Sequence, residues 1–226
     1  MNEYFNLIKS SDVLDILYGK KTVQQLHDKL YRWLERFCRS QEELDRELLA
    51  VNSLFEVFSK FIENLTMEEY DALSQYGRKV GSTSFEINES LRLNLPLNDE
   101  NSQTIKLLDR AISKFNLAEE LIVYRALKTP NIDFTDEGYM SASLSLSASY
   151  ATFDGYDDIL EIHLPAGTSC IYLEWFKGAG DEAEILLARG TSLNLEGSKT
   201  INLFGKSKRL YICTAIQKNY EQALIR

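Results

Sequence analysis

Apolar residues recur at helical spacing through the first part of the chain. From Val13 to about Leu65 they fall three and four positions apart, which predicts one short amphipathic helix followed by two long ones. The apolar stripes of the two long helices contain Val23, Leu26, Leu30, Trp33 and Phe37, and then Leu44, Leu48, Val51, Phe55, Phe58 and Ile62. We expect their aromatic rings to face the core or a neighbouring helix, so we assign these residues no chemistry.

Helical signals continue to about residue 115. Thr66-Met67-Glu68-Glu69 has the form of a capping box, with Thr66 as N-cap and Glu69 three residues later, and predicts a helix through about Tyr76. Two further helices are predicted over about Phe85–Leu93 and about Ser102–Phe115.

The pattern changes after Glu120, where short β-branched or aromatic runs alternate with glycines and polar turns. These runs predict seven or eight strands: LIVYRAL, GYMSAS, DILEIHL, SCIYLEW, AEILLAR, TSLNL, INLFG and RLYICTAI. Helices followed by strands indicate an α+β fold. We expect residues 66–226 to form the core domain and residues 1–65 to form a helical segment packed on the same globule.

Composition and charge disfavour several classes of protein. The chain has 226 residues, and its 25 Lys and Arg against 34 Asp and Glu give a net charge of −9 without a local basic patch. This balance disfavours a nucleic-acid partner or an anionic membrane surface. The N-terminus lacks a basic region followed by an apolar run, so we see no signal peptide and expect no membrane insertion. Secretion by a signal-independent route, and earlier removal of a leader, both remain compatible with this sequence.

Cysteine and histidine usage argues against a metal site or a disulfide framework. Cys38, Cys170 and Cys213 are odd in number and far apart, so we expect core thiols. His27 and His163 are the only histidines, which nearly excludes sites that need two or three histidine ligands. Either one would have to supply the base of a Ser-His-Asp triad, and we expect surface or core roles for both.

Three features of the strand region are candidates for chemistry. Arg125 lies inside the apolar run LIVYRAL, where a guanidinium must be paired within the structure or face a ligand. The run YMSASLS begins 14 residues later; its serines are either turn and cap residues or part of a site. Glu182 and Glu184 alternate at the predicted start of a strand, where both would point to one face as solvated charges or as a paired site.

Together, in this order and spacing, the three features resemble the Arg-Ser-Glu class of mono-ADP-ribosyltransferases, which includes clostridial binary actin toxins and Rho-modifying exoenzymes. The likeness covers about Thr66 to Ile216. It includes LTMEEYDALSQYG, FEINESLRLN with the Asn-x-x-Leu-Arg pattern at Asn88 to Arg92, and FTDEGYMSAS, EIHLPAG and EAEILLARGT. The resemblance implies a mixed two-sheet β core preceded by helices.

The resemblance also implies an NAD-cleaving site. Glu184 would hold the ribose and stabilise the oxocarbenium-like cation left when nicotinamide departs, and Ser141 would fix the rotamer of Glu184. Arg125 and Arg92 would clamp the diphosphate, since planar guanidinium forks pair with phosphate. Further NAD contacts are expected at Asn88, Ala126, Ser143 and Phe153; for Phe153, a stack on nicotinamide and a place in the core both remain open.

The acceptor is expected to be a protein arginine. Within the class, Glu at the position of Glu182 usually accompanies arginine modification, because a second carboxylate both holds and deprotonates the guanidinium. The chain departs from the class at Ala142, the middle of the usual Ser-Thr-Ser. It departs again at Phe153-Asp154-Gly155-Tyr156, where the class has Phe-x-x-Arg.

These observations predict a toxin or effector that transfers ADP-ribose from NAD to an arginine of a target protein. It would be secreted or delivered into a host cell cytosol, with NAD as co-substrate and no metal. The N-terminal helices would belong to the globule or dock a partner or delivery component. Three alternatives remain: an NAD glycohydrolase, a phage enzyme that modifies host proteins, and a catalytically silent binding module of the same fold.

Overall fold

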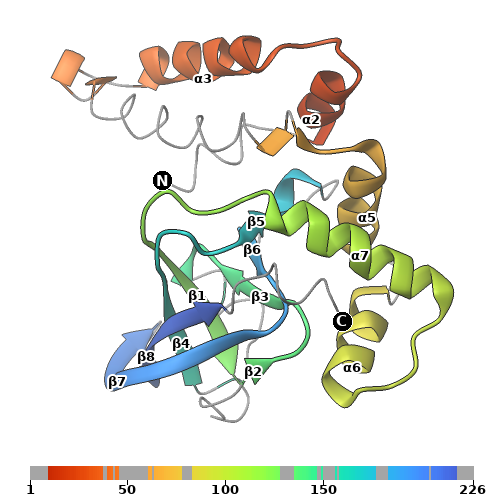
Figure 1. Cartoon of the computed structure of the whole chain (residues 1–226). Helices are drawn as coiled ribbons and strands as arrows, with labels where there is room; N and C mark the ends of the chain where they lie inside the picture. Colours follow the sequence, from red (N-terminus) through yellow and green to blue (C-terminus); the bar gives the residue numbers. More distant parts are fainter. Residues whose placement is uncertain are drawn as a thin grey trace.

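The computed structural model describes residues 10–37, 40–42, 44–45, 61–62, 64–77, 83–127, 135–146, 149, 156, 158–176, 183–203 and 205–217. Helices precede strands along the chain, and the two form separate regions of the molecule (Figure 1). This arrangement confirms the predicted α+β class. The helices are α2 (Ser10–Leu17), α3 (Val23–Phe37), α5 (Met67–Gly77), α6 (Thr83–Leu93) and α7 (Asp99–Ser113). The strands are β1 (Leu121–Leu127), β2 (Thr135–Asp136), β3 (Met140–Ser143), β4 (Asp158–Leu164), β5 (Cys170–Tyr172), β6 (Glu184–Leu187), β7 (Thr191–Leu203) and β8 (Lys206–Gln217).

Local capping signals decide where α5 and α7 begin. The capping box before α5 is formed as predicted: the Thr66 backbone N–H donates to Glu69 Oε2 at 2.8 Å, and the Glu69 N–H donates to Thr66 Oγ1 at 3.3 Å. Helix α7 begins three residues before the predicted Ser102, because Asn98 Oδ1 accepts the N–H of Asn101 at 2.7 Å and caps the helix.

The described strands form one hydrogen-bonded sheet in the order β2-β7-β8-β4-β1-β3-β6-β5. The expected division into two sheets is therefore wrong in this detail, although the class of fold is confirmed. One half of the sheet consists of β2, β7, β8, β4 and β1, and the other of β3, β6 and β5. The two halves are joined where β1 and β3 pair at Tyr124 and Ser143. Because this junction is so short, hydrophobic alternation along the strands does not reveal whether the halves are joined.

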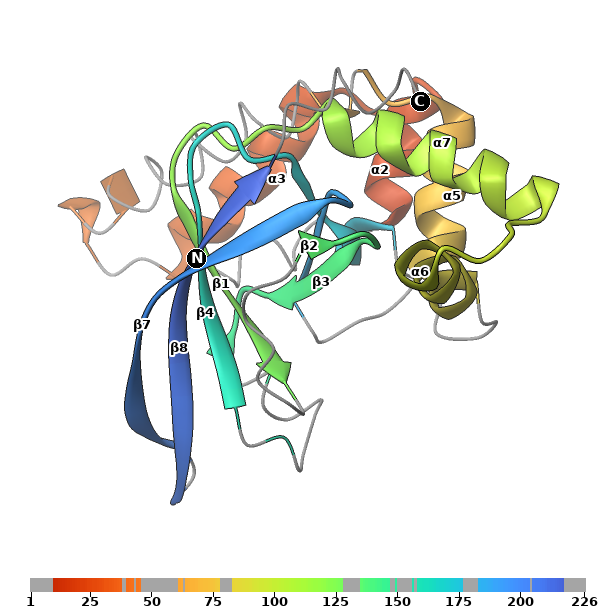
Figure 2. The same cartoon turned by 60° about the horizontal axis from the view of Figure 1, so that its bottom comes forward.

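The position of the short strand β2 shows that the sheet curls. It lies at the far edge, antiparallel to β7, yet only residues 137–139 separate it from β3 near the other end of the order. Such a connection spans at most about 14 Å. The sheet therefore bends until β2 comes within that distance of β3, and both ends of the connection lie against α6, through Asp136 and Tyr139 (Figure 2).

The predicted strands TSLNL and INLFG are a single strand, β7. Its register with β8 shifts between Leu195 and Gly197, and most of its side chains beyond Leu193 are exposed. The polar segment that suggested a turn is the solvent-exposed middle of a long hairpin.

The main buried cluster combines side chains of the N-terminal part with those of the sheet. Val13, Leu26, Phe61 and Ile62 belong to the same cluster as residues of α5, α7 and the strands. The boundary between residues 65 and 66 stays a prediction. Cys170 and Cys213 are buried free thiols, whereas Cys38 lies outside the described residues. Within the described ranges, no helix is both long and apolar enough to cross a membrane.

Candidate active site

The Ser141–Glu184 pair lies at the junction of β3 and β6. These strands are antiparallel, with Ser143 opposite Glu184 and Ser141 opposite Leu186, so Ser141 and Glu184 are diagonal neighbours on one face. Ser141 Oγ donates to Glu184 Oε1 at 2.5 Å. The serine hydroxyl therefore holds the glutamate, as the resemblance implied, while Ala142 between the two serines is buried in the core.

The backbone before Glu184 leaves the strand conformation. Strand β6 begins at Glu184, and Ala183 has a φ of 48°, in the left-handed region that residues other than glycine rarely adopt. The expectation that Glu182 and Glu184 share a face assumed a strand that continues through Ala183, and it stays a prediction. Glu182 itself lies outside the described residues. Strained backbone of this kind concentrates at functional sites.

Arg125 is a half-buried cation without a carboxylate partner among the described residues. Its Nη1 donates to the backbone carbonyl of Ser141 at 2.5 Å, which ties β1 to the serine strand. Burial lowers the pKa of Arg125 below its ordinary value; Asp136 and Glu184 raise it, and Arg92 lowers it further. An arginine stays protonated even so. The remaining N–H groups of this guanidinium suit a bound anion.

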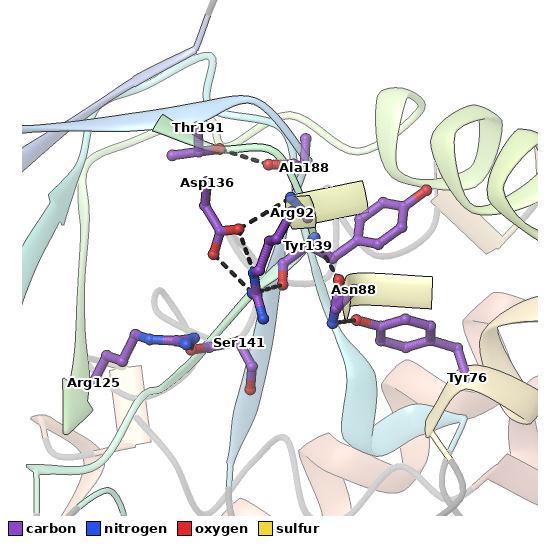
Figure 3. Close-up of polar contacts among 10 residues, drawn as sticks. Tyr76, Asn88, Arg92, Arg125, Asp136, Tyr139, Ser141, Ala188 and Thr191 are labelled. Carbon is purple, nitrogen blue, oxygen red and sulfur yellow. Dashed lines mark hydrogen bonds and ion pairs between the residues drawn. The ribbon is translucent and has the colours of Figure 1, made fainter. Parts of the chain in front are cut away.

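Arg92 is engaged by a carboxylate that the sequence did not single out. Its Nε donates to Asp136 Oδ1 at 2.7 Å and its Nη2 to Asp136 Oδ2 at 2.8 Å, which makes a bidentate pair (Figure 3). Nη2 also donates to the carbonyl of Tyr139 at 3.3 Å. Burial lowers the pKa of Arg92, but the hydrogen bonds and charge of Asp136 outweigh that effect and raise it overall.

Asn88 fastens the turn before β3 to helix α6. It lies one helical turn before Arg92 on the same face. The Tyr139 backbone N–H donates to Asn88 Oδ1 at 2.8 Å, and Asn88 Nδ2 donates to the hydroxyl of Tyr76 at 2.7 Å (Figure 3). Burial is the main reason that the pKa of Tyr76 is raised, although the Asn88 hydrogen bond lowers it. Asn88, expected to contact NAD, thus has its amide oxygen and nitrogen bonded within the protein.

Gly138 permits this close approach of turn and helix. A Cβ added at Gly138 would lie 2.7 Å from Asn88 Oδ1 and 3.2 Å from Arg92 Nε, closer than side chains normally pack. Sequence reasoning missed Asp136, Gly138 and the role of the Tyr139 backbone. The available signal was the Asp-x-Gly turn between two short strands.

The other predicted site residues lie as follows. Ser143 is buried and its Oγ accepts the backbone N–H of Ser145 at 3.0 Å. Ala126 is buried on β1 opposite Ile159. Phe153 lies outside the described residues. The contacts described above bring together the side chains of α6, β1, β3 and β6 that the sequence singled out, namely Asn88, Arg92, Arg125, Ser141 and Glu184. Within the described part of the chain, no group of three or more His, Cys, Asp or Glu side chains forms a metal site.

Comparison with known proteins identifies the class. A family model described as ADP-ribosyltransferase exoenzyme matches residues 17–133 and 128–219. The chain therefore belongs to the ADP-ribosyltransferase exoenzyme family, a class of bacterial toxin-like ADP-ribosylating enzymes. A search of curated proteins found no match.

Solved structures show the same fold. Plx2a, an ADP-ribosyltransferase toxin from Paenibacillus larvae, is 20% identical with a TM-score of 0.61, and the match covers 72% of this chain and 92% of that one. The Clostridium limosum C3 exoenzyme is 18% identical with a TM-score of 0.58, and the match covers 72% of this chain and 90% of that one. BECa, an ADP-ribosylating toxin of a C. perfringens binary enterotoxin solved with NADH, is 19% identical with a TM-score of 0.56. That match covers 74% of this chain and 48% of BECa.

Proposed function

We propose that this protein cleaves NAD and transfers ADP-ribose to an arginine of a target protein. The observation that carries the proposal is the joined arrangement of Arg125, Ser141 and Glu184. Arg125 donates to the carbonyl of Ser141, and the hydroxyl of the same serine donates to Glu184. A cation without a carboxylate partner and an oriented carboxylate are thus linked through one residue, and NAD requires both an anion site and a carboxylate beside its ribose.

Glu184 would act where charge develops. The bond that breaks joins the ribose to the positively charged nicotinamide nitrogen; nicotinamide leaves with the bonding electron pair and becomes neutral. The ribose then carries an oxocarbenium-like charge, which a fixed carboxylate stabilises. Ser141 is a positioning residue, because its hydrogen bond keeps Glu184 in one rotamer before the charge appears.

Arg125 and Arg92 would bind the diphosphate. Arg125 supplies a charge that the described carboxylates leave unpaired, and Arg92 supplies a guanidinium already held by Asp136. Arginine forks recognise phosphate oxygens through two parallel hydrogen bonds. NADH in the structure of BECa, which has the same fold, is consistent with a dinucleotide at this site.

The acceptor proposal rests on Glu182. A guanidinium is a poor nucleophile while protonated, and a second carboxylate near Glu184 would accept its proton as the new N–C bond forms to the ribose carbon. The protein would act as a toxin or effector, secreted or delivered into a host cell, and the N-terminal helices would dock the target or a delivery component.

Variants of the two glutamates separate cleavage from transfer. The wild-type protein, incubated with NAD labelled in the adenylate moiety and a cell lysate, should release nicotinamide and label a protein on arginine. Glu184→Gln should abolish both activities, whereas Glu182→Gln should abolish labelling and retain most nicotinamide release. Glu196→Gln, an exposed carboxylate on β7, serves as the matched control and should change neither.

Each rival predicts a different outcome. Nicotinamide release without any labelled protein would make the chain an NAD glycohydrolase. A Glu184→Gln variant that consumes NAD as fast as the parent would overturn the catalytic assignment. Label found only on Asn, Gln or Cys would overturn the arginine proposal, and a labelled bacterial transcription or translation protein would favour a phage enzyme.

A further inference from the structure

We propose that Asp136 is a positioning residue that orients Arg92 toward the diphosphate of NAD. The inference rests on the proposed function, because it assigns a role within the same binding site. It goes beyond the predicted site residues, none of which explains how the exposed arginine of α6 is held in one orientation.

Asp136 occupies one edge of the Arg92 guanidinium and leaves another available. Its carboxylate is 3% exposed and binds Nε and Nη2, while the Tyr139 carbonyl accepts a second bond from Nη2. The Arg92 side chain is 39% exposed, and its Nη1 has no partner among the described residues. The two N–H groups of Nη1 therefore remain to donate to a phosphate.

Asp136 is itself fixed by its neighbours. Its Oδ1 also accepts the N–H of Gly138 at 3.0 Å, and its backbone carbonyl accepts the N–H of Gly190 at 2.7 Å. Strand β2, which contains Asp136, pairs with β7 at Thr191. A ligand-binding side chain supported by a buried, fully engaged neighbour meets the requirement for preorganisation.

The effect of Asp136→Asn on NAD affinity, whether a loss, a gain or no change, distinguishes three roles of Asp136. If Asp136 orients Arg92, Asp136→Asn should weaken NAD binding, since an amide binds the guanidinium edge less well. If its negative charge mainly repels the phosphates, the same variant should bind NAD more tightly. If Asp136 only stabilises the fold, the variant should unfold more easily but bind NAD as the parent does.

Calorimetric titration with NAD measures the dissociation constant and therefore shows whether the affinity falls, rises or stays the same. A Glu184→Gln background prevents consumption of NAD, and in it Asp136→Asn should raise the dissociation constant about tenfold, the loss expected for one charge-assisted hydrogen bond. Asp12→Asn is the matched control: Asp12 is equally buried and is paired with Lys21 and Lys29 at 3.0 Å each, but lies on α2. It should leave the constant within about twofold.

A second variant keeps the test valid if Asp136→Asn does not fold. Arg92→Lys retains the charge and removes the fork, so it should also weaken NAD binding about tenfold. Where Asp136→Asn does fold, adding it to Arg92→Lys should change the affinity little, because both substitutions disrupt one interaction. Parental affinity in Arg92→Lys, additive losses in the double variant, or unchanged or tighter binding in Asp136→Asn would overturn the proposal.

These titrations, combined with the nicotinamide-release assay of the parent protein, separate this inference from the proposed function. A parent that releases nicotinamide but binds NAD independently of Asp136 keeps the function and overturns the inference. If the parent binds NAD in an Asp136-dependent way but releases no nicotinamide, the inference is kept and the proposed function is overturned. A parent that does not bind NAD at all overturns both.

Discussion

The hydroxyl of Ser141 offers the most direct test of the site. Ser141→Ala removes the donor to Glu184 Oε1 but keeps the backbone carbonyl that accepts from Arg125. The substitution therefore removes this one restraint on the carboxylate and keeps the contact to the proposed phosphate-binding arginine. We expect NAD cleavage to slow through a lower kcat, with KM for NAD nearly unchanged.

The size of the effect follows from the environment of Glu184. A hydrogen bond to a charged group contributes about 1.5–3 kcal/mol. Glu184 is half-buried, so water partly replaces the lost donor and the lower end applies. About 1.4 kcal/mol corresponds to a tenfold change in rate, and we expect kcat to fall about tenfold.

Initial rates of nicotinamide release across a range of NAD concentrations would measure both constants. Ser113→Ala is the control, since Ser113 Oγ donates to the Arg110 carbonyl at 2.9 Å at the end of α7, away from Glu184. A parental kcat in Ser141→Ala would refute the reasoning. A raised KM with parental kcat would instead indicate that the hydroxyl contacts NAD.

Three further predictions concern stability and reactivity. Gly138→Ala should lower the free energy of unfolding in urea by about 1–3 kcal/mol, because the new Cβ meets Asn88, whereas Gly197→Ala, with no atom within 4 Å of its Cβ, should be tolerated. Ala183→Gly should change thermal stability little and Ala183→Val should lower it, because a φ of 48° suits glycine and is strained for a β-branched side chain. Burial raises the pKa of Cys170 to about 12, so its thiol should stay protonated and resist alkylation at pH 8 until the chain unfolds, as mass spectrometry of digests would show.

The sequence predicted best those elements whose signals are local. The capping box at Thr66 located the start of α5, because an N-cap and its partner three residues later form the same contacts wherever the helix packs. The sequence predicted less well those elements whose structure depends on residues far away in the chain. Residues 196–200, between the two runs predicted as strands, resemble a turn in composition, and pairing with β8 makes them part of one strand.

The candidate site divides in the same way. A family pattern singled out Arg125, Ser141 and Glu184. The structure shows the expected hydrogen bond between Ser141 and Glu184, together with a contact from Arg125 to the Ser141 carbonyl that was not predicted; their roles in NAD cleavage stay a prediction. Asp136 was not identified, since its importance comes from Arg92, 44 residues earlier in the chain. A lone aspartate in a turn is common, and only the curled sheet brings it against helix α6.

The pairing of β2 with β7 also governs when the site can form. Thr135 contacts Ser192, 57 residues later, and the Ser141–Glu184 pair spans 43 residues. Contacts between segments so far apart form slowly, because loop closure must precede them. Activity regained after dilution from denaturant should therefore lag behind the return of helical circular dichroism, since competence for NAD is acquired with the last strands rather than with the first helices.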